Sequence, residues 1–122
     1  MPVPPEIQGQ KYISLITFRK NGAAVPTPVW FGEKDDKIYV MTRSDSGKYK
    51  RIRNNPQVRI APCTVRGKIT GPEFAATARI LPPDAWPAAH KTIKKKYWLT
   101  RITLFWSSKN IFVEIAGFSS RA

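Results

Sequence analysis

The chain has 122 residues, with 21 Lys or Arg against 8 Asp or Glu, which gives a formal net charge of +13. This length fits a single domain, residues 1–122, and excludes a two-domain enzyme. A lone cysteine and a lone histidine exclude a disulfide scaffold and the zinc-finger classes, while 42% hydrophobic and 11% aromatic residues are enough for a folded core.

The first residues, Met1 to Glu6, lack a basic region followed by an apolar run, so they do not read as a secretory signal. No apolar stretch approaches the roughly 20 residues that a membrane-spanning helix needs. We therefore expect a cytoplasmic protein that does not enter a membrane, and its charge requires an anionic partner.

Residues 12–18 predict a first strand, because they are β-branched and aromatic with apolar residues on both faces. Asn21-Gly22 predicts a hairpin turn into a return strand over residues 26–31. Pro26 and Pro28 lie two residues apart, so both missing N–H groups face the same side of that strand. Two interpretations stay open: a sheet edge protected against aggregation, and backbone left free beside a ligand.

After a turn at residues 34–37 and a strand at 38–42, a short helix is expected, capped by Asp45 or Ser46 and ended by Asn54-Asn55-Pro56. The stretch between this strand and this helix holds hydroxyls, a glycine and two cations. A helix N-terminus stabilises an anion, so the stretch is typical of a phosphate site. The alternative is a capped helix with solvated lysines. The residues that would bind the anion are Thr42, Arg43, Ser44, Ser46 and Lys48.

Further strands are expected at residues 58–61, 74–81 and 111–116, the last closed by Gly117. Between them, the absence of Gly and Pro from Ala88 to Lys109 and the spacing of Ile93 and Tyr97 predict a longer helix. Six strands and two helical segments indicate a mainly β protein: a small barrel or curled sheet with helices packed on it.

No assembled catalytic group is evident. His90 has no second ligand type near it, so we expect no metal site, and Cys63 is typical of a buried structural thiol. A reaction would therefore need a cofactor. The lysine run at residues 91–96 beside aromatic residues fits a single-stranded nucleic-acid interface, but its helical spacing favours a buried aromatic face and makes nucleic acid unlikely.

Five segments recur in a familiar order: Thr-Phe-Arg-Lys-Asn-Gly (17–22), Pro-Thr-Pro-Val-Trp-Phe (26–31), Thr-Arg-Ser-Asp-Ser-Gly-Lys (42–48), the segment 51–58 and Ala-Pro-Cys (61–63). Together they resemble the pyridoxamine 5′-phosphate oxidase-like superfamily, whose fold is a six-stranded split β-barrel that binds flavin mononucleotide (FMN). The Ser-x-Lys followed by Asn-Pro is the most specific of these. The branch that looks most similar is the reductases that depend on the deazaflavin coenzyme F420.

The resemblance implies a homodimer with a deazaflavin or flavin in a groove between the subunits. The loop from Thr42 to Lys48 would grip the cofactor phosphate, with Lys48 as the main cation, and the backbone at Pro28, Val29 and Trp30 would lie along the ring system. Arg59, with Arg43, Lys50 and Arg53, would meet the polyglutamate tail of F420. A small-molecule electron acceptor would take the hydride.

The leading interpretation is thus an F420-dependent oxidoreductase. Two alternatives stay open: an FMN-binding redox protein of the same fold, and a nucleic-acid-binding barrel. The source of any proton is unassigned, with Tyr39, Arg59 and solvent all compatible with the sequence.

Overall fold

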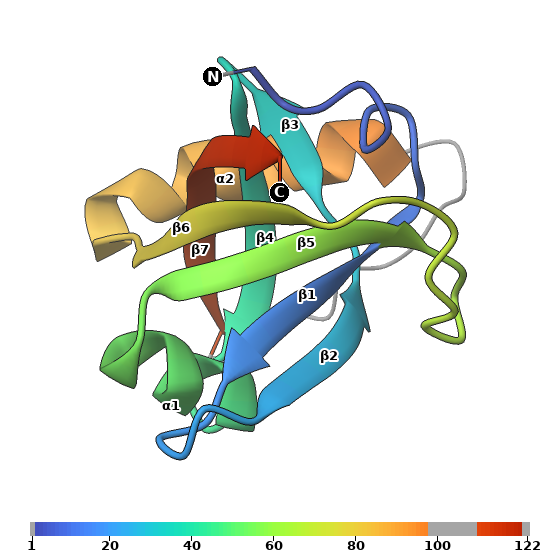
Figure 1. Cartoon of the computed structure of the whole chain (residues 1–122). Helices are drawn as coiled ribbons and strands as arrows, with labels where there is room; N and C mark the ends of the chain where they lie inside the picture. The colour runs from blue at the N-terminus through green and yellow to red at the C-terminus, as the bar shows by residue number, and fades with distance from the viewer. Residues whose placement is uncertain (1, 98–109, 121–122) are drawn as a thin grey trace.

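The computed structural model describes residues 2–97 and 110–120, and within them seven strands form one antiparallel sheet in the order β2-β1-β5-β6-β7-β4-β3. Two helices and a 3-10 turn complete these residues (Figure 1). The elements are β1 (Tyr12–Phe18), β2 (Ala24–Val29), β3 (Gly32–Lys34), β4 (Lys37–Arg43), α1 (Gly47–Asn54), β5 (Gln57–Cys63), β6 (Phe74–Ile80), η1 (Pro83–Ala85), α2 (Trp86–Tyr97) and β7 (Asn110–Ser120).

The sheet is curled and left open along one side. Its two edge strands, β2 and β3, are joined only by Trp30 and Phe31. Such a link spans at most about 11 Å, so the two edges must meet at that point. Because β3 pairs only with Lys37–Tyr39 of β4, the far half of β4 has no strand partner on that side within the part of the chain that the structure describes. This gap between β2 and the end of β4, here called the split, makes the fold a split β-barrel.

The mainly β fold predicted from the sequence is confirmed, with one more strand than expected. The additional strand, β3, has only three residues, which are too few to show an alternating pattern. The prolines also lie as predicted, since β2 is an edge strand paired only with β1. Pro28 and Pro26 pair with Ser14 and Ile16 of β1, and neither proline has an N–H group to donate. The N–H groups of β2 that point toward β1 must therefore belong to the residues that alternate with the prolines.

The predicted turns follow from local backbone preferences. Gly22 has a φ of +88°, and its N–H donates to the Arg19 carbonyl at 2.8 Å to close the β1–β2 turn. Asp35 and Asp36 both take positive φ, at 53° and 64°, which is the geometry that lets a two-residue hairpin match the twist of β3 and β4. Ser46 rather than Asp45 caps α1, accepting a hydrogen bond from the Tyr49 N–H at 3.2 Å.

The main core fills the barrel with side chains from one face of each long strand, including Ile13, Val40, Ile60 and Ile115. The N-terminal segment contributes Val3 and Ile7, both buried, and so closes one end. A second cluster lies on the outer face of the sheet, where Ile93 of α2 packs with Phe112 of β7. At Gly32 an added Cβ would lie 2.9 Å from the Thr92 backbone, so the glycine permits the contact between β3 and α2.

Two boundary predictions were wrong. Gly117 does not close the last strand: β7 runs through it to Ser120, with Gly117 at φ +70° beside a register shift in the pairing with β6. The second strand lies two residues earlier than predicted, since Trp30 and Phe31 form the link to β3. The predicted long helix is α2 over Trp86–Tyr97, and its expected continuation to residue 109 lies outside the described residues.

Candidate functional site

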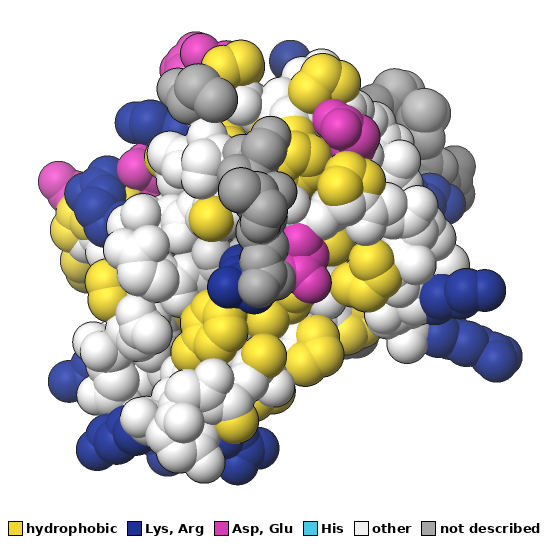
Figure 2. Space-filling model, viewed as in Figure 1, with side chains coloured by type: hydrophobic (Ala, Val, Ile, Leu, Met, Phe, Trp, Pro, Cys, Tyr) yellow, Lys and Arg dark blue, Asp and Glu magenta, His cyan; other side chains and the backbone are white. Residues whose placement is uncertain are grey.

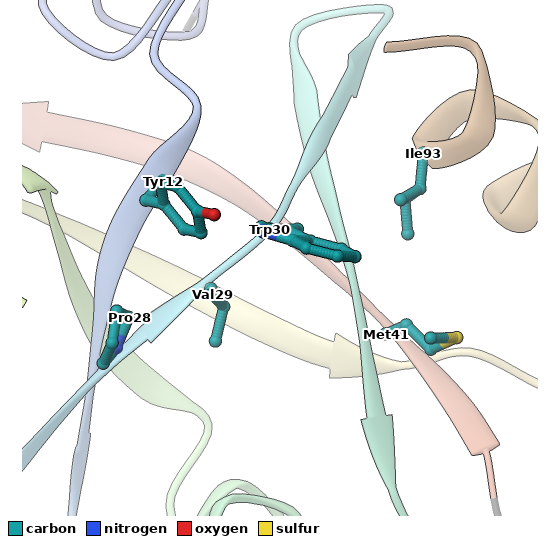
Figure 3. Close-up of a pocket in the computed structure, with 6 residues that line it drawn as sticks. All are labelled: Tyr12, Pro28, Val29, Trp30, Met41 and Ile93. Atoms are coloured by element: carbon teal, nitrogen blue, oxygen red, sulfur yellow. The ribbon is translucent and has the colours of Figure 1, made fainter. Parts of the chain in front are cut away.

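A hollow of about 250 Å³ opens on the outer surface at the split (Figure 3). Its walls come from four elements and the β2–β3 link, so only the folded sheet brings them together. They are Tyr12, Pro28, Val29, Trp30, Met41 and Ile93. Pro28, Val29 and Trp30, the three residues predicted to lie along a ring system, therefore all line this hollow.

The chemistry of this hollow is apolar and aromatic. The rings of Tyr12 and Trp30 lie 6.4 Å apart at 49°, a tilted arrangement in which both rings contribute to the same wall. The lining side chains carry no formal charge, and the Tyr12 hydroxyl and Trp30 N–H are their only hydrogen-bonding groups. Such a surface suits an uncharged planar group and excludes an isolated ion.

Beyond Met41, the chain leaves the hollow and turns from β4 into α1. The hydroxyls of Thr42 and Ser46 lie 3.1 Å apart, and the Ser46 N–H donates to the Arg43 carbonyl at 3.0 Å. Thr42 is buried away from water, so the hydrogen bond with Ser46 gives its hydroxyl the partner that a buried polar group needs. The turn thus holds the start of α1, and Lys48 two residues after Ser46, at a fixed place beside the split.

A cluster of three cations, Arg19, Lys48 and Arg51, lies at this end of the barrel. The Arg51 Nε donates to Oγ1 of the buried Thr17 at 2.6 Å, which fixes the guanidinium against β1. Burial, and then the charge of Arg51, lower the pKa of Lys48; burial, and then Arg19, lower the pKa of Arg51. Within residues 2–97 and 110–120 none of the three forms an ion pair.

This cation cluster is electrostatically costly on its own. Like charges placed close together repel, more strongly where two of them, Lys48 and Arg51, are partly buried, and a carboxylate would normally compensate them. The sequence has no Asp or Glu from residue 46 to 72 or from residue 7 to 32, the segments that contain all three cations. A bound anion such as a phosphate would supply the missing negative charge.

The other predicted anion-binding residues are placed less favourably. Arg43 is exposed and donates from Nε and Nη2 to the two carboxylate oxygens of Asp45, at 3.0 and 3.1 Å, so its charge is already engaged. Ser44 lies in the same turn, and nothing in the described contacts directs it toward a ligand. Arg59 lies on β5, 3.6 Å from Glu73 and over the Phe18 ring at 5.5 Å, and it does not line the hollow.

Tyr39, weighed from the sequence as a proton source, also does not line the hollow. Its hydroxyl donates to Glu114 at 3.3 Å, and burial followed by the charge of Glu114 raises the pKa of the phenol. A phenol with a raised pKa that already donates to a carboxylate is a poor general acid for a substrate elsewhere.

Sequence reasoning missed Tyr12, Met41 and Ile93 in the hollow, and Thr17 and Arg19 in the cation cluster. Tyr12 and Met41 could have been found as apolar residues on the strand face opposite the core. The contact that holds Arg51 could not have been found, because it joins α1 to Thr17, 34 residues earlier in the chain.

The hollow lies at the end of the edge strand β2, and the cation cluster, held by Thr17 of β1, lies near the start of that strand. Val29 lines the hollow, while Val25 pairs with Thr17, the residue that holds Arg51. Four strand residues separate them, or about 13 Å along β2. The split therefore offers an apolar surface for a flat ring and, farther along, positive charge for a phosphate. The residues present fit a flavin-type cofactor.

Other chemistry is weakly supported. The described residues contain no group of three or more His, Cys, Asp or Glu able to hold a metal ion, and no helix among them is long and apolar enough to cross a membrane. His90 lies against Phe112, with ring centres 5.8 Å apart. Cys63 is buried, and burial raises the pKa of its thiol, so it is held in the unreactive form.

Comparisons with solved structures give the same fold. An F420 reductase is 17% identical with a TM-score of 0.64 over 98% of this chain and 100% of its own. General stress protein 26 of Bacillus anthracis is 23% identical with a TM-score of 0.63, covering 95% of this chain and 93% of that one. HutZ, a heme storage protein of Vibrio cholerae, is 16% identical with a TM-score of 0.63, covering 98% and 95%.

These identities show the fold alone, and the three structures differ in function. No curated protein matches the sequence significantly. The family model described as pyridoxamine 5′-phosphate oxidase matches residues 4–110, which is most of the chain. The chain therefore belongs to the pyridoxamine 5′-phosphate oxidase family.

Proposed function

We propose that this protein is an oxidoreductase that binds the deazaflavin coenzyme F420 at the split and passes hydride to a small, unsaturated or conjugated acceptor. The observation behind the proposal is an apolar aromatic hollow at one end of β2 and, near the other end, a cation cluster with no ion pair among the described residues. Membership of the family and the fold shared with an F420 reductase support it.

In this proposal the residues of the chain bind and orient the cofactor. Trp30 and Tyr12 would lie against the ring system, and Lys48 and Arg51 would hold the phosphate, with Thr42 and Ser46 offering hydroxyls nearby. The bound deazaflavin would supply the hydride, so the hollow needs no nucleophile of its own, and solvent would supply the proton that completes the reduction. The apolar walls would exclude water and favour an uncharged acceptor.

The preference for F420 over FMN rests on charge beyond the phosphate. Lys50 and Arg53 are exposed on α1 next to the cation cluster, where carboxylates of a polyglutamate tail could reach them. Each such exposed pair contributes about 1 kcal/mol or less, so the effect comes from several together. FMN, which lacks the tail, is the alternative cofactor for the same site.

A second copy of the chain would complete the site. The hollow, at about 250 Å³, is smaller than the roughly 300–1,000 Å³ of typical ligand pockets, so one protomer covers only part of a cofactor. Val65 and Ile69 are the exposed large hydrophobic residues of the described chain. The turn that carries them lies beside β2, since a Cβ added at Gly67 would be 3.7 Å from Pro28. A homodimer formed across this side would cover both apolar surfaces.

The test is an equilibrium titration of the purified protein with F420 and with FMN, followed by the visible absorption of each cofactor. We expect tighter binding of F420, and at least a tenfold loss of its affinity in Lys48→Ala, because a charge-assisted hydrogen bond contributes about 1.5–3 kcal/mol. Tighter binding of FMN would reject the choice of cofactor. Absence of binding by either would reject the site.

A further inference from the structure

The end of the barrel that carries α1 and the β1–β2 turn has a cationic surface that exceeds what a cofactor phosphate needs. Besides the partly buried Lys48 and Arg51, four cations are exposed there and form what we call the cationic rim. Figure 2 shows Lys and Arg side chains gathered at this end, without acidic side chains among them on the face in view. The rim consists of Arg19, Lys20, Lys50 and Arg53.

The positive charge of the rim is not balanced by acidic residues close to it in the sequence. The segments 7–32 and 46–72, which contain all four rim residues, have no acidic residue at all. Within the described residues, the rim cations form no ion pair, and Arg53 instead lies 5.5 Å from the centre of the Tyr49 ring. The surface therefore keeps its full charge toward solvent.

A hollow of about 290 Å³ opens within this surface, lined by Phe18, Arg19, Lys20, Asn54 and Asn55. Its composition differs from that of an ion site. Phe18 offers a partly exposed aromatic ring with the Arg59 guanidinium 5.5 Å from its centre. Asn54 and Asn55 contribute side-chain amides, which both donate and accept hydrogen bonds. The amide oxygen of Asn55 already accepts a hydrogen bond from the Gln57 N–H at 3.1 Å.

An aromatic ring, amide groups and a surrounding rim of cations match the needs of a nucleic-acid strand. Bases stack on aromatic rings and arginine planes and are read by amides, while Lys and Arg neutralise the phosphates. Stable attachment to an anionic membrane would add apolar side chains that insert beside the cations at the same end. The exposed large hydrophobic residues of the described chain, Val65 and Ile69, lie on the β5–β6 turn rather than at the rim.

We propose that the cationic rim and the hollow at Phe18 form a binding surface for single-stranded nucleic acid. This surface does not include the apolar hollow at Trp30, but it shares Arg19 with the cation cluster and Lys50 and Arg53 with the surface proposed for the F420 tail. One base would stack in the hollow at Phe18, and the phosphates on either side would lie against Arg19, Lys20, Lys50 and Arg53. With four phosphate contacts, the logarithm of affinity falls with the logarithm of salt concentration with a slope of about −3.

The experiment measures fluorescence anisotropy of a labelled twelve-residue oligouridine with the full chain, from 50 to about 300 mM salt. The test variant Lys50→Ala/Arg53→Ala has a matched control, Arg66→Ala/Lys68→Ala, which removes the same two residue types from the exposed β5–β6 turn. We expect the test variant to reduce the slope by about 1.4 and the control to leave it within 0.3 or so of wild type. Phe18→Leu, which keeps an apolar side chain, should weaken binding at least fivefold at every salt concentration.

Three results would overturn the proposal. Equal losses in the test and control variants would show binding by overall charge alone. No effect of Phe18→Leu in a variant with unchanged thermal stability would remove the base-stacking site. Binding of phosphatidylglycerol vesicles but not of the oligonucleotide, with the same loss in Lys50→Ala/Arg53→Ala, would assign the rim to a membrane surface.

Discussion

Ser46 links the stability of the fold to the proposed anion site, because one side chain caps α1 while the helix it caps carries Lys48 and Arg51. Ser46→Ala removes the acceptor for the Tyr49 N–H at 3.2 Å and the partner of the buried Thr42 hydroxyl at 3.1 Å. Loss of an N-cap costs about 1 kcal/mol, and the unpaired hydroxyl adds to this, so we expect a total of about 1–2 kcal/mol. For a chain of this size that lowers Tm by roughly 3–8 °C.

The companion variant Ser46→Asp separates the two roles. Aspartate caps a helix as well as serine does, and its charge suits the helix N-terminus, so Tm should stay within about 2 °C of wild type. The new carboxylate also lies two residues before Lys48 and compensates the cation cluster, so F420 should bind about tenfold more weakly. Differential scanning calorimetry and cofactor titration measure the two effects. An unchanged Tm in Ser46→Ala would refute the capping role, and wild-type affinity in Ser46→Asp would refute the anion site.

Lys48→Met removes a partly buried charge that Arg51 repels, so the Tm of the cofactor-free protein should stay unchanged or rise. The affinity for F420 should fall, because a cation of the proposed site is lost. A clear drop in Tm would contradict this. Because the folded pKa of Lys48 is lowered, the folded state binds fewer protons than the unfolded chain, so stability should rise as pH increases toward 10.5, and urea titrations should show a smaller rise in Lys48→Met. Ser14→Ala should raise stability by up to about 1 kcal/mol, since its buried hydroxyl has no hydrogen-bond partner among residues 2–97 and 110–120; destabilisation would indicate one. Gly32→Ala should lower Tm by several degrees, because its Cβ would lie 2.9 Å from the Thr92 backbone; an unchanged Tm would show that α2 shifts at little cost.

The features that could be predicted from the sequence are those decided by neighbours in the chain. Gly22 and the Asp35-Asp36 pair adopt the positive φ angles that their turns need, and Ser46 caps the helix that follows it. Pro26 and Pro28 also indicated from the sequence that β2 is an edge strand. A proline has no N–H group to donate to a neighbouring strand, whatever the rest of the fold. The order of the helices and strands could therefore be predicted almost completely from residues that are neighbours in the chain.

Features that depend on distant residues could not be predicted. The short β3 exists because the β4 hairpin supplies a partner for Gly32–Lys34, and β7 passes Gly117 because a shift in the β6 pairing accommodates it. In the candidate site, Lys48 was found from its own loop. Its repulsive neighbour Arg51 is positioned by Thr17 on another element, which no local pattern shows.

The central claim is that the split holds a ring at Trp30 and a phosphate at Lys48. The most direct test compares two ligands, F420 and its phosphate-free deazaflavin core, by equilibrium titration of wild type and Lys48→Ala. We expect Lys48→Ala to weaken the binding of F420 at least tenfold and to leave the affinity for the core within about twofold of wild type. Equal losses for both ligands, or unchanged binding of F420, would contradict it.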